Sequence, residues 1–289
     1  MALLVLGAIF LFFLIAVFLI AGFMGRTTSL ALGEKVGVIE IEGVIVSSKN
    51  TIEQLIRFKE DNSVKAIVLR IDSPGGGVGP SQEIFREVTK TVEVKPVVVS
   101  MGSVAASGGY YIAAPAQRIL ANPGTITGSI GVIMEFTNWQ ELLDKLGLKS
   151  QVVKSGRYKD IGSPVRPMSD GDRELLQSLI DDVHRQFVDA VARGRNLPED
   201  EVRALADGRI FTGSQALEAG LVDELGNLQD AIVVAANLGG IGEKPRIVYP
   251  PREKGKFFDY LIKEAASNLR RGLQESTASG LQYLWSGIE

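Results

Sequence analysis

The most apolar stretch of the chain lies at its N-terminus. Residues Ala2 to Met24 include no charged side chain and no strongly polar one. At a rise of about 1.5 Å per residue, a helix of this length can span a bilayer core of about 30 Å. A cleaved signal peptide has a shorter apolar region, typically about 7–15 residues, after a basic start. We therefore expect residues 1–25 to form a transmembrane anchor and residues 26–34 a linker. The weak cleavage-like site Ser29-Leu30-Ala31 leaves a cleaved signal as the alternative.

Beyond the linker, apolar runs of strand length alternate with segments of helical periodicity. The strand-like runs are Val36–Ile41, Val64–Ile71, Val97–Met101, Ile119–Leu120, Ile130–Met134 and Gln151–Lys154. The helical segments are Thr51–Glu60, Ser81–Lys90, Ser107–Ala113, Trp139–Leu146, Ser169–Arg195 and Thr212–Leu221. This alternation predicts an α/β domain over residues 35–250 with a largely parallel sheet. We expect residues 251–289 to be a C-terminal tail; its stretch from Phe257 to Trp285 has an amphipathic pattern and carries no chemical motif.

Composition narrows the chemistry that this domain can perform. The 289 residues include no cysteine and one histidine, His184, which excludes a disulfide framework, a cysteine nucleophile and a histidine-rich metal site. The net charge of −3, without a basic run, gives no argument for nucleic acid. His184 lies at the edge of the apolar stripe of the predicted helix Ser169–Arg195, where we interpret it as a structural residue. A hydrolase built on this chain therefore needs a base other than histidine, and we expect no cofactor.

Glycine-containing turns follow the predicted strands. The turn Asp72–Gly77 reads Asp-Ser-Pro-Gly-Gly-Gly. Its glycines permit positive φ and close backbone approach, so the turn could aim N–H groups at a ligand oxygen or could be a plain tight turn. It lacks the glycine spacing and the Lys-Ser/Thr ending of a phosphate-binding loop. A later turn, Thr127–Val132, reads Thr-Gly-Ser-Ile-Gly-Val and contains Ser129.

Small residues surround Ser107 on both sides. The segment Met101–Tyr111 reads Met-Gly-Ser-Val-Ala-Ala-Ser-Gly-Gly-Tyr-Tyr. A nucleophilic serine on a strand-to-helix turn needs small neighbours, so that a substrate carbonyl can reach its Oγ and a following N–H can meet the oxyanion. The alternatives are that Ser107 only caps the helix, or that Ser103, with bulkier surroundings, is the nucleophile.

Lys159 is the candidate base. It lies in Lys154–Asp160, which reads Lys-Ser-Gly-Arg-Tyr-Lys-Asp. A lone lysine is usually a solvated surface charge, but a base is required here and histidine is nearly absent. Lysine acts as a base only as the neutral amine, and the ordinary lysine pKa is about 10.4. We therefore expect Lys159 to be buried among apolar groups beside Ser107.

On these residues the chain resembles bacterial signal peptide peptidase A (protease IV) in its short, single-repeat form. The Ala-Ala-Ser-Gly-Gly-Tyr stretch around Ser107 is similar to the family's nucleophile motif, and Lys159 follows 52 positions later, as in the short members. Ser129 resembles the serine that hydrogen-bonds the lysine amine in this family. The Ser-Pro-Gly-Gly turn resembles the oxyanion loop of the wider Clp protease and crotonase fold, which implies that the Gly76 and Gly108 amides form the oxyanion hole.

The resemblance covers roughly residues 35–250 and implies more than the site. It implies a Clp protease/crotonase-like fold, and a homo-oligomer whose active sites face the interior of a bowl. The implied substrates are apolar peptides that include remnant signal peptides. The implied location is the cell membrane, with a single-pass anchor and the catalytic domain outside the cytoplasm. In the tail, the small-residue stretch Ser276–Gly280 leads us to expect that the protein trims its own C-terminus.

Two other functions stay open from the sequence alone. A crotonase-type acyl-CoA enzyme would use the Gly76 turn for a thioester oxyanion, but it would want a carboxylate near the segment Met101–Tyr111, where the sequence has none. An inactive membrane scaffold would keep the fold without activity, although the Ser107 and Lys159 pair argues against it.

Overall fold

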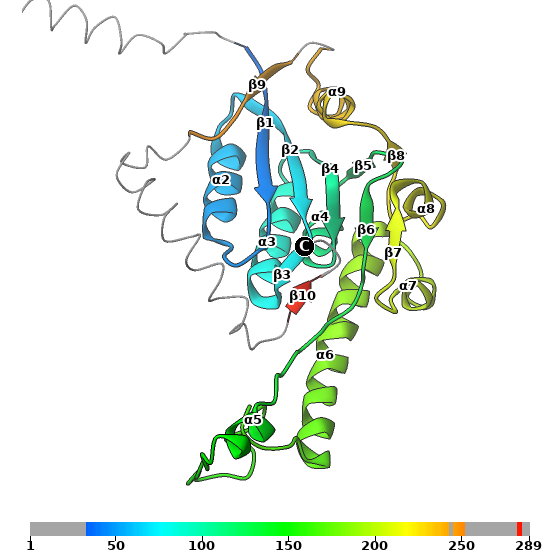
Figure 1. Ribbon diagram of the computed structural model, residues 1–289. Coiled ribbons are helices and arrows are strands. Elements are labelled where there is room, and N and C mark those ends of the chain that lie inside the picture. Colours follow the sequence, from blue (N-terminus) through cyan, green and yellow to red (C-terminus); the bar gives the residue numbers. More distant parts are fainter. Residues whose placement is uncertain (1–32, 243–244, 252–281, 285–289) are drawn as a thin grey trace, which may run out of the picture. The chain divides into compact units, whose positions relative to one another are not determined.

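The computed structural model describes residues 33–242, 245–251 and 282–284 (Figure 1). The anchor expected at residues 1–25 and the stretch Ser276–Gly280 lie outside these ranges. Within them, no helix has the length and apolar character needed to cross a bilayer.

The domain is built around a mixed α/β arrangement with one large sheet. Its strands are β1 (Lys35–Glu42), β2 (Val64–Ser73), β4 (Val97–Ala106), β5 (Arg118–Ala121), β6 (Ile126–Gly128), β7 (Ile210–Thr212), β8 (Glu224–Leu225) and β9 (Arg246–Val248). In the described residues they run in the order β7-β6-β4-β2-β1-β9, with β5 paired to β4 and β8 paired to β5. Every pairing in this sheet is parallel except β6 with β7, as the alternation of strands and helices predicts.

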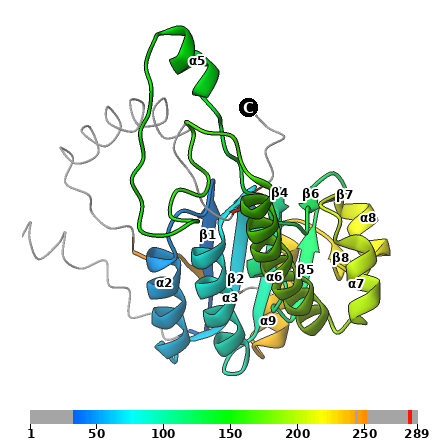
Figure 2. The ribbon, with the colours of Figure 1, turned by 90° about the horizontal axis from the view of Figure 1, so that it is seen from below.

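Helices cover both faces of the sheet (Figures 1 and 2). They are α2 (Lys49–Glu60), α3 (Val78–Val92), α4 (Gly108–Ala113), α5 (Gln140–Lys145), α6 (Asp170–Arg195), α7 (Glu199–Leu205), α8 (Gly213–Glu218) and α9 (Leu228–Leu238). Val36 and Val38 of β1 join the core cluster beneath α9, whereas Ile39 and Ile41 join the larger cluster with α2, α3, α4 and α6. Because both faces are buried, the central parts of β1, β2 and β4 carry apolar side chains that point to either face.

Strand β4 reaches farther than its apolar run indicates. Its first half pairs with β5 and its second half, Val104–Ala106, pairs with β6. The expected strand Val97–Met101 therefore continues to Ala106, directly before Ser107. This extension places Ser107 at the carboxyl end of a central strand, which is where parallel α/β sheets position their ligands.

Two expected strands are absent from the described residues. Residues 130–134 form no strand, because the neighbour of β4 is the preceding segment, β6. Gln151–Lys154 is also not a strand, and Val153 is fully exposed there. A β-branched run needs a partner strand to satisfy its backbone, and no described segment pairs with this one.

Residues 131–169 form a long segment between β6 and α6 that we call the excursion. Both ribbon views show it projecting beyond the layers of the sheet, with α5 at its far end (Figures 1 and 2). The apolar stripe of α6 faces the core only in its second half. Val183, Phe187 and Val191 are buried, but Leu175 and Leu179, nearer the excursion, are 40% and 45% exposed.

Candidate active site

Ser107 occupies a strained turn between β4 and α4. Its backbone has φ 52° and ψ −117°, a combination that is costly for any residue with a side chain and that clusters at active sites. Its N–H donates to the carbonyl of Gly128 (2.8 Å) and its carbonyl accepts from the N–H of Tyr111 (2.8 Å). The hydroxyl makes no capping hydrogen bond to α4, so the alternative that Ser107 only caps the helix is not supported. A strained serine between strand and helix is the geometry of a nucleophile elbow.

Ser103, the other candidate nucleophile, has a different environment from Ser107. Ser103 lies within β4 with an exposed side chain. It precedes the turn, so it has no helix N-terminus behind it and no following first-turn amide to meet an oxyanion. The geometry of an activated nucleophile therefore falls on Ser107.

The glycine turn after β2 lies against the start of α4. Its residues Gly75–Gly77 form the short strand β3, and Gly75 has φ +103°. A Cβ on Gly75 would come within 2.7 Å of the Gly108 nitrogen, and a Cβ on Gly108 within 3.1 Å of the Gly76 nitrogen. Only glycine allows backbones to approach this closely. The amides of Gly76 and Gly108 thus lie beside each other at the turn that carries Ser107.

A strand from the C-terminus, β10 (Gln282–Leu284), runs antiparallel to β3, with Tyr283 opposite Gly76. The Tyr283 carbonyl oxygen lies 2.0 Å from the position that a Cβ on Gly75 would take, and the Gly108 nitrogen lies 2.7 Å from the same point. The carbonyl and the Gly108 amide are therefore neighbours. In this way β10, paired with β3, sets a backbone carbonyl next to the Gly108 amide.

The Tyr283 side chain fills an aromatic pocket and is fully buried. Its ring stacks on Tyr111 with centroids 5.0 Å apart and lies 4.6 Å from the ring of Phe187. Its hydroxyl donates to the carbonyl of Val183 (3.3 Å), and burial raises the pKa of the Tyr283 phenol. Tyr111 and Phe187 were not singled out from the sequence as site residues. The signal available was the position of Tyr111, four residues after Ser107.

Ser129 lies next to Ser107 in space because β6 pairs with the end of β4. It follows Gly128, whose carbonyl accepts the Ser107 N–H. Its own backbone is left-handed, with φ 50°, its side chain is nearly buried, and its N–H donates to the carbonyl of Arg209 (2.8 Å). The structure therefore brings together four of the five expected site residues.

Lys159 is the exception, because its side chain is exposed in a turn of the excursion. A Cβ on Gly171, in the first turn of α6, would lie 2.8 Å from the Arg157 guanidinium and 3.4 Å from the Tyr158 hydroxyl. Sixteen residues later on that helix, Phe187 contacts Tyr111 at 4.9 Å between centroids. Sixteen residues of helix measure about 24 Å. The expected burial of Lys159 beside Ser107 is therefore not met within one chain.

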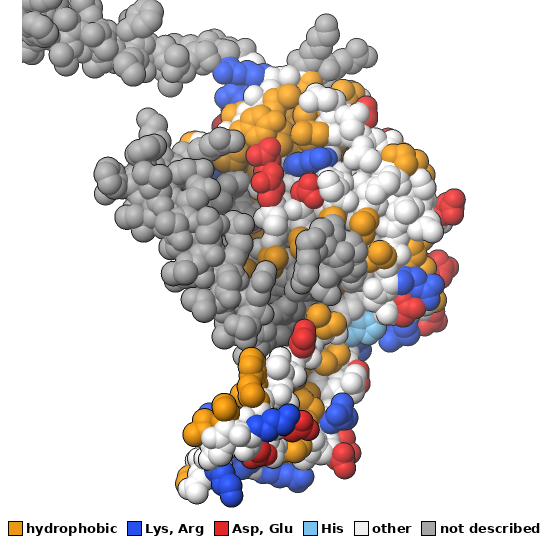
Figure 3. Space-filling model, in the orientation of Figure 1, with side chains coloured by type: hydrophobic (Ala, Val, Ile, Leu, Met, Phe, Trp, Pro, Cys, Tyr) orange, Lys and Arg blue, Asp and Glu red, His pale blue; other side chains and the backbone are white. Residues whose placement is uncertain are grey.

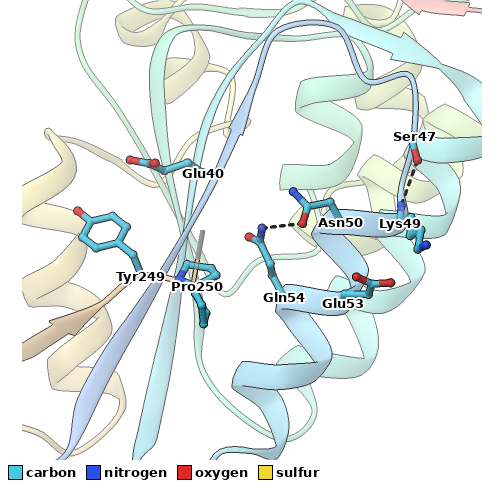
Figure 4. Close-up of a pocket in the computed structure, with 9 residues that line it drawn as sticks. Glu40, Ser47, Lys49, Asn50, Glu53, Gln54, Tyr249 and Pro250 are labelled. Atoms are coloured by element: carbon cyan, nitrogen blue, oxygen red, sulfur yellow. Dashed lines mark hydrogen bonds between the residues drawn. The ribbon is translucent and has the colours of Figure 1, made fainter. Parts of the chain in front are cut away.

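A separate hollow lies between β1 and α2 (Figure 4). Its lining includes Glu40, Lys49, Glu53 and Tyr249. The Ser47 hydroxyl there accepts a long hydrogen bond from the Lys49 backbone (3.4 Å). None of the residues around Ser107 contributes to it, so the chemistry of the chain is not centred there.

Comparison with known proteins identifies the family. Peptidase family S49 matches residues 89–242, and Clp protease matches residues 35–124. A Synechocystis sp. protein whose name describes it as a protease is 48% identical over 209 residues, covering 72% of this chain and 76% of the relative. A protein of Enterococcus faecium named as a signal peptide peptidase SppA is 38% identical over 216 residues, covering 70% of this chain and 63% of the relative.

Protease 4 of Haemophilus influenzae is 36% identical over 261 residues, covering 86% of this chain but 42% of the relative. The chain thus spans less than half of that larger protein. Of the functions that the sequence left open, these matches support the peptidase rather than the acyl-CoA enzyme or the inactive scaffold. The mostly parallel sheet also agrees with a Clp protease-like fold. The chain belongs to peptidase family S49 and is a serine-type endopeptidase.

Proposed function

We propose that this protein is a membrane-anchored endopeptidase in which Ser107 attacks the peptide bond and Lys159 is the general base. The observation that carries the proposal is the strained turn at Ser107, whose following amide, Gly108, lies beside Gly76. Neutral Lys159 takes the hydroxyl proton as Oγ bonds to the scissile carbonyl carbon. The Gly76 and Gly108 N–H groups stabilise the resulting oxyanion, an effect of roughly 3–4 kcal/mol per donor in comparable sites. The protonated lysine then returns the proton to the leaving amine, and water hydrolyses the acyl-enzyme by the same route.

The substrate binds as an added antiparallel strand on β3. The support is β10, which occupies that position and sets the Tyr283 carbonyl beside the Gly108 amide. Main-chain pairing of this kind gives affinity, while pockets for individual side chains give selectivity. The aromatic pocket around Tyr283 favours apolar and aromatic residues before the cleaved bond. Remnant signal peptides, which are apolar, fit this description, with the domain held outside the cytoplasm by the run Ala2–Met24.

Lys159 reaches Ser107 from a neighbouring copy of the chain. The separation of about 24 Å along α6 argues against the pair forming within one chain in this conformation. The excursion also carries exposed apolar side chains among its charges (Figure 3). They are Ile133, Trp139, Leu142, Leu146, Leu148, Val152, Val153 and Tyr158. Exposed apolar side chains gathered on one projecting segment are typical of a surface that packs against another protein. A homo-oligomer would cover this surface and complete each site.

A fluorophosphonate probe and co-expression of two inactive variants test the proposal. Ser107→Ala should lose labelling and peptidase activity, whereas Ser103→Ala should keep both. Ser107→Ala and Lys159→Ala chains, each inactive alone, should regain activity when co-expressed with different tags and purified as mixed oligomers. Persistent labelling of Ser107→Ala would remove the nucleophile assignment. Mixed oligomers that stay inactive would show that Lys159 acts within its own chain or not at all.

The C-terminus offers an independent test. The position of Tyr283 makes Tyr283–Leu284 the bond that self-trimming would cut, rather than a bond within Ser276–Gly280. Intact-mass spectrometry of the wild type should then find a chain that ends at Tyr283. The Ser107→Ala variant should retain all residues to Glu289, and equal masses for the two proteins would contradict self-trimming.

A further inference from the structure

The turn that carries Lys159 is held by a cluster of charged side chains where the excursion joins the start of α6. The guanidinium of Arg166 donates to both carboxylate oxygens of Asp160, from Nε (2.9 Å) and from Nη2 (3.0 Å). It also donates from Nη2 to the Asp160 backbone carbonyl (3.2 Å) and from Nη1 to the Asp172 carboxylate (2.6 Å). One arginine therefore joins the residue directly after Lys159 to the first turn of α6.

Further contacts make this connection stiff. Asp172 is 2% exposed and its carboxylate accepts the N–H of Ser169, as part of the capping box that begins α6. Lys154 donates to Asp160 (2.6 Å) and to the Arg157 carbonyl (2.9 Å). A bidentate arginine–carboxylate pair fixes orientation as well as distance. Lys154 thus closes the turn 154–160 on itself, and Asp160 at its end is joined through Arg166 to the start of a 26-residue helix.

The cluster also keeps the carboxylate next to Lys159 in sequence ionised and paired with other cations. Asp160 is the carboxylate adjacent to it in sequence, and both Asp160 oxygens are engaged by Arg166 and Lys154. Hydrogen bonds from Arg166 and then Lys154 lower the pKa of Asp160 well below its ordinary range. A carboxylate held by two cations is poorly placed to pair with a third. The Lys159 side chain is exposed, and among the described residues its amine has no ion-pair partner.

We propose that Arg166 is a positioning residue for Lys159: by clamping Asp160 and Asp172 together, it presents the lysine amine to the Ser107 of a neighbouring copy. The inference rests on the proposed function, because it gives Lys159 the role of the base. Arg166 itself touches neither the substrate nor the nucleophile. Its substitution should therefore change the rate of the chemical step more than the binding of the peptide.

Steady-state kinetics on the full chain test the clamp. Arg166→Met should lower kcat about 10- to 100-fold with KM within about twofold, because a displacement of about 1 Å can cost about 100-fold. Arg166→Lys keeps the charge but cannot bridge both carboxylates, so most of the loss should persist. Arg185→Met is the matched control, because Arg185 pairs with the exposed Asp182 on α6, and it should match the wild type. Wild-type kcat in Arg166→Met would overturn the inference.

Mixed oligomers separate positioning from a general loss of folding. Arg166→Met is placed either in the Ser107→Ala chain, which supplies Lys159, or in the Lys159→Ala chain, which supplies Ser107. Activity should be lost in the first mixture and retained in the second. Equal losses in both mixtures would mean a structural role only and would overturn the inference. If Lys159→Ala alone remained active, the proposed base would be wrong. If Lys159→Ala were inactive but Arg166→Met fully active, only this inference would fail.

Discussion

The strain at Ser107 predicts an unusual ranking of two inactive variants. Ser107→Ala keeps a Cβ in a backbone conformation with φ 52° and ψ −117°, whereas Ser107→Gly removes the cause of the strain. Residues in such conformations cost about 1–3 kcal/mol. Two effects oppose this gain. Glycine raises the conformational entropy of the unfolded chain, which lowers the stability by about 0.4–1 kcal/mol. Loss of the buried methyl group lowers it by up to about 0.8 kcal/mol more. From the middle of each range and the full loss of burial, we expect Ser107→Gly to be the more stable of the two by roughly 0.5 kcal/mol.

Thermal unfolding followed by far-ultraviolet circular dichroism, which reports the helices and strands of the whole domain, measures this difference. For a domain of this size, about 1 kcal/mol moves Tm by about 2–4 °C. Ala106→Gly is the control, because Ala106 is buried in the regular part of β4 and glycine there should lower Tm. The two neighbouring positions should therefore respond to glycine with opposite signs. If Ser107→Gly fell below Ser107→Ala by as much as Ala106→Gly falls below the wild type, the strain argument would be refuted.

Three further predictions follow from the site. Gly108→Ala would set a Cβ 2.8 Å from the Ser81 hydroxyl and displace an oxyanion donor, so kcat should fall about 100- to 1000-fold, measured with a fluorogenic peptide. Lys159→Ala and Lys159→Arg should both be inactive, because guanidinium stays charged, while His184→Gln should keep most activity; the reverse result would require a histidine mechanism. The Arg166 hydrogen bond lowers the pKa of Asp172 from 3.8 to about 2. The stability that this contributes is present above about pH 4 and is lost as pH falls towards 2, so the Tm gap between wild type and Asp172→Asn should close over that range.

The sequence was sufficient to predict the parallel sheet and the strand-to-helix turn at Ser107 because their signals are local. An apolar run such as Val64–Ile71 can be buried on both faces only in a covered parallel sheet. Small residues on both sides of Ser107 are what a strand-to-helix elbow requires. These features depend on neighbouring residues, and the structure confirms the strand, the turn and the following helix.

Pairing partners were harder to predict than elements. The expected strand at residues 130–134 fails because β4 changes partner along its length, from β5 to β6, and no local pattern reports where such a change occurs. β10 was missed for a related reason. Its strand conformation comes from the exposed edge of β3, which lies more than 200 residues away in the sequence, so its own residues carry no distinctive signal.

The position of Lys159 relative to Ser107 could not be predicted from sequence spacing. A separation of 52 residues identifies which lysine matches the family pattern, but it does not say whether the nucleophile and base of one chain meet. The structure gives a physical reason for the difference: Ser107 is fixed in the sheet, whereas Lys159 is fixed through Asp160 to the start of α6. The helix between them is a rigid spacer of about 24 Å from Gly171 to Phe187. In the proposed mechanism, a base mounted on such a spacer is better suited to reach a neighbour's serine than its own. We therefore expect activity to depend on assembly, so that an isolated chain would not act as a peptidase.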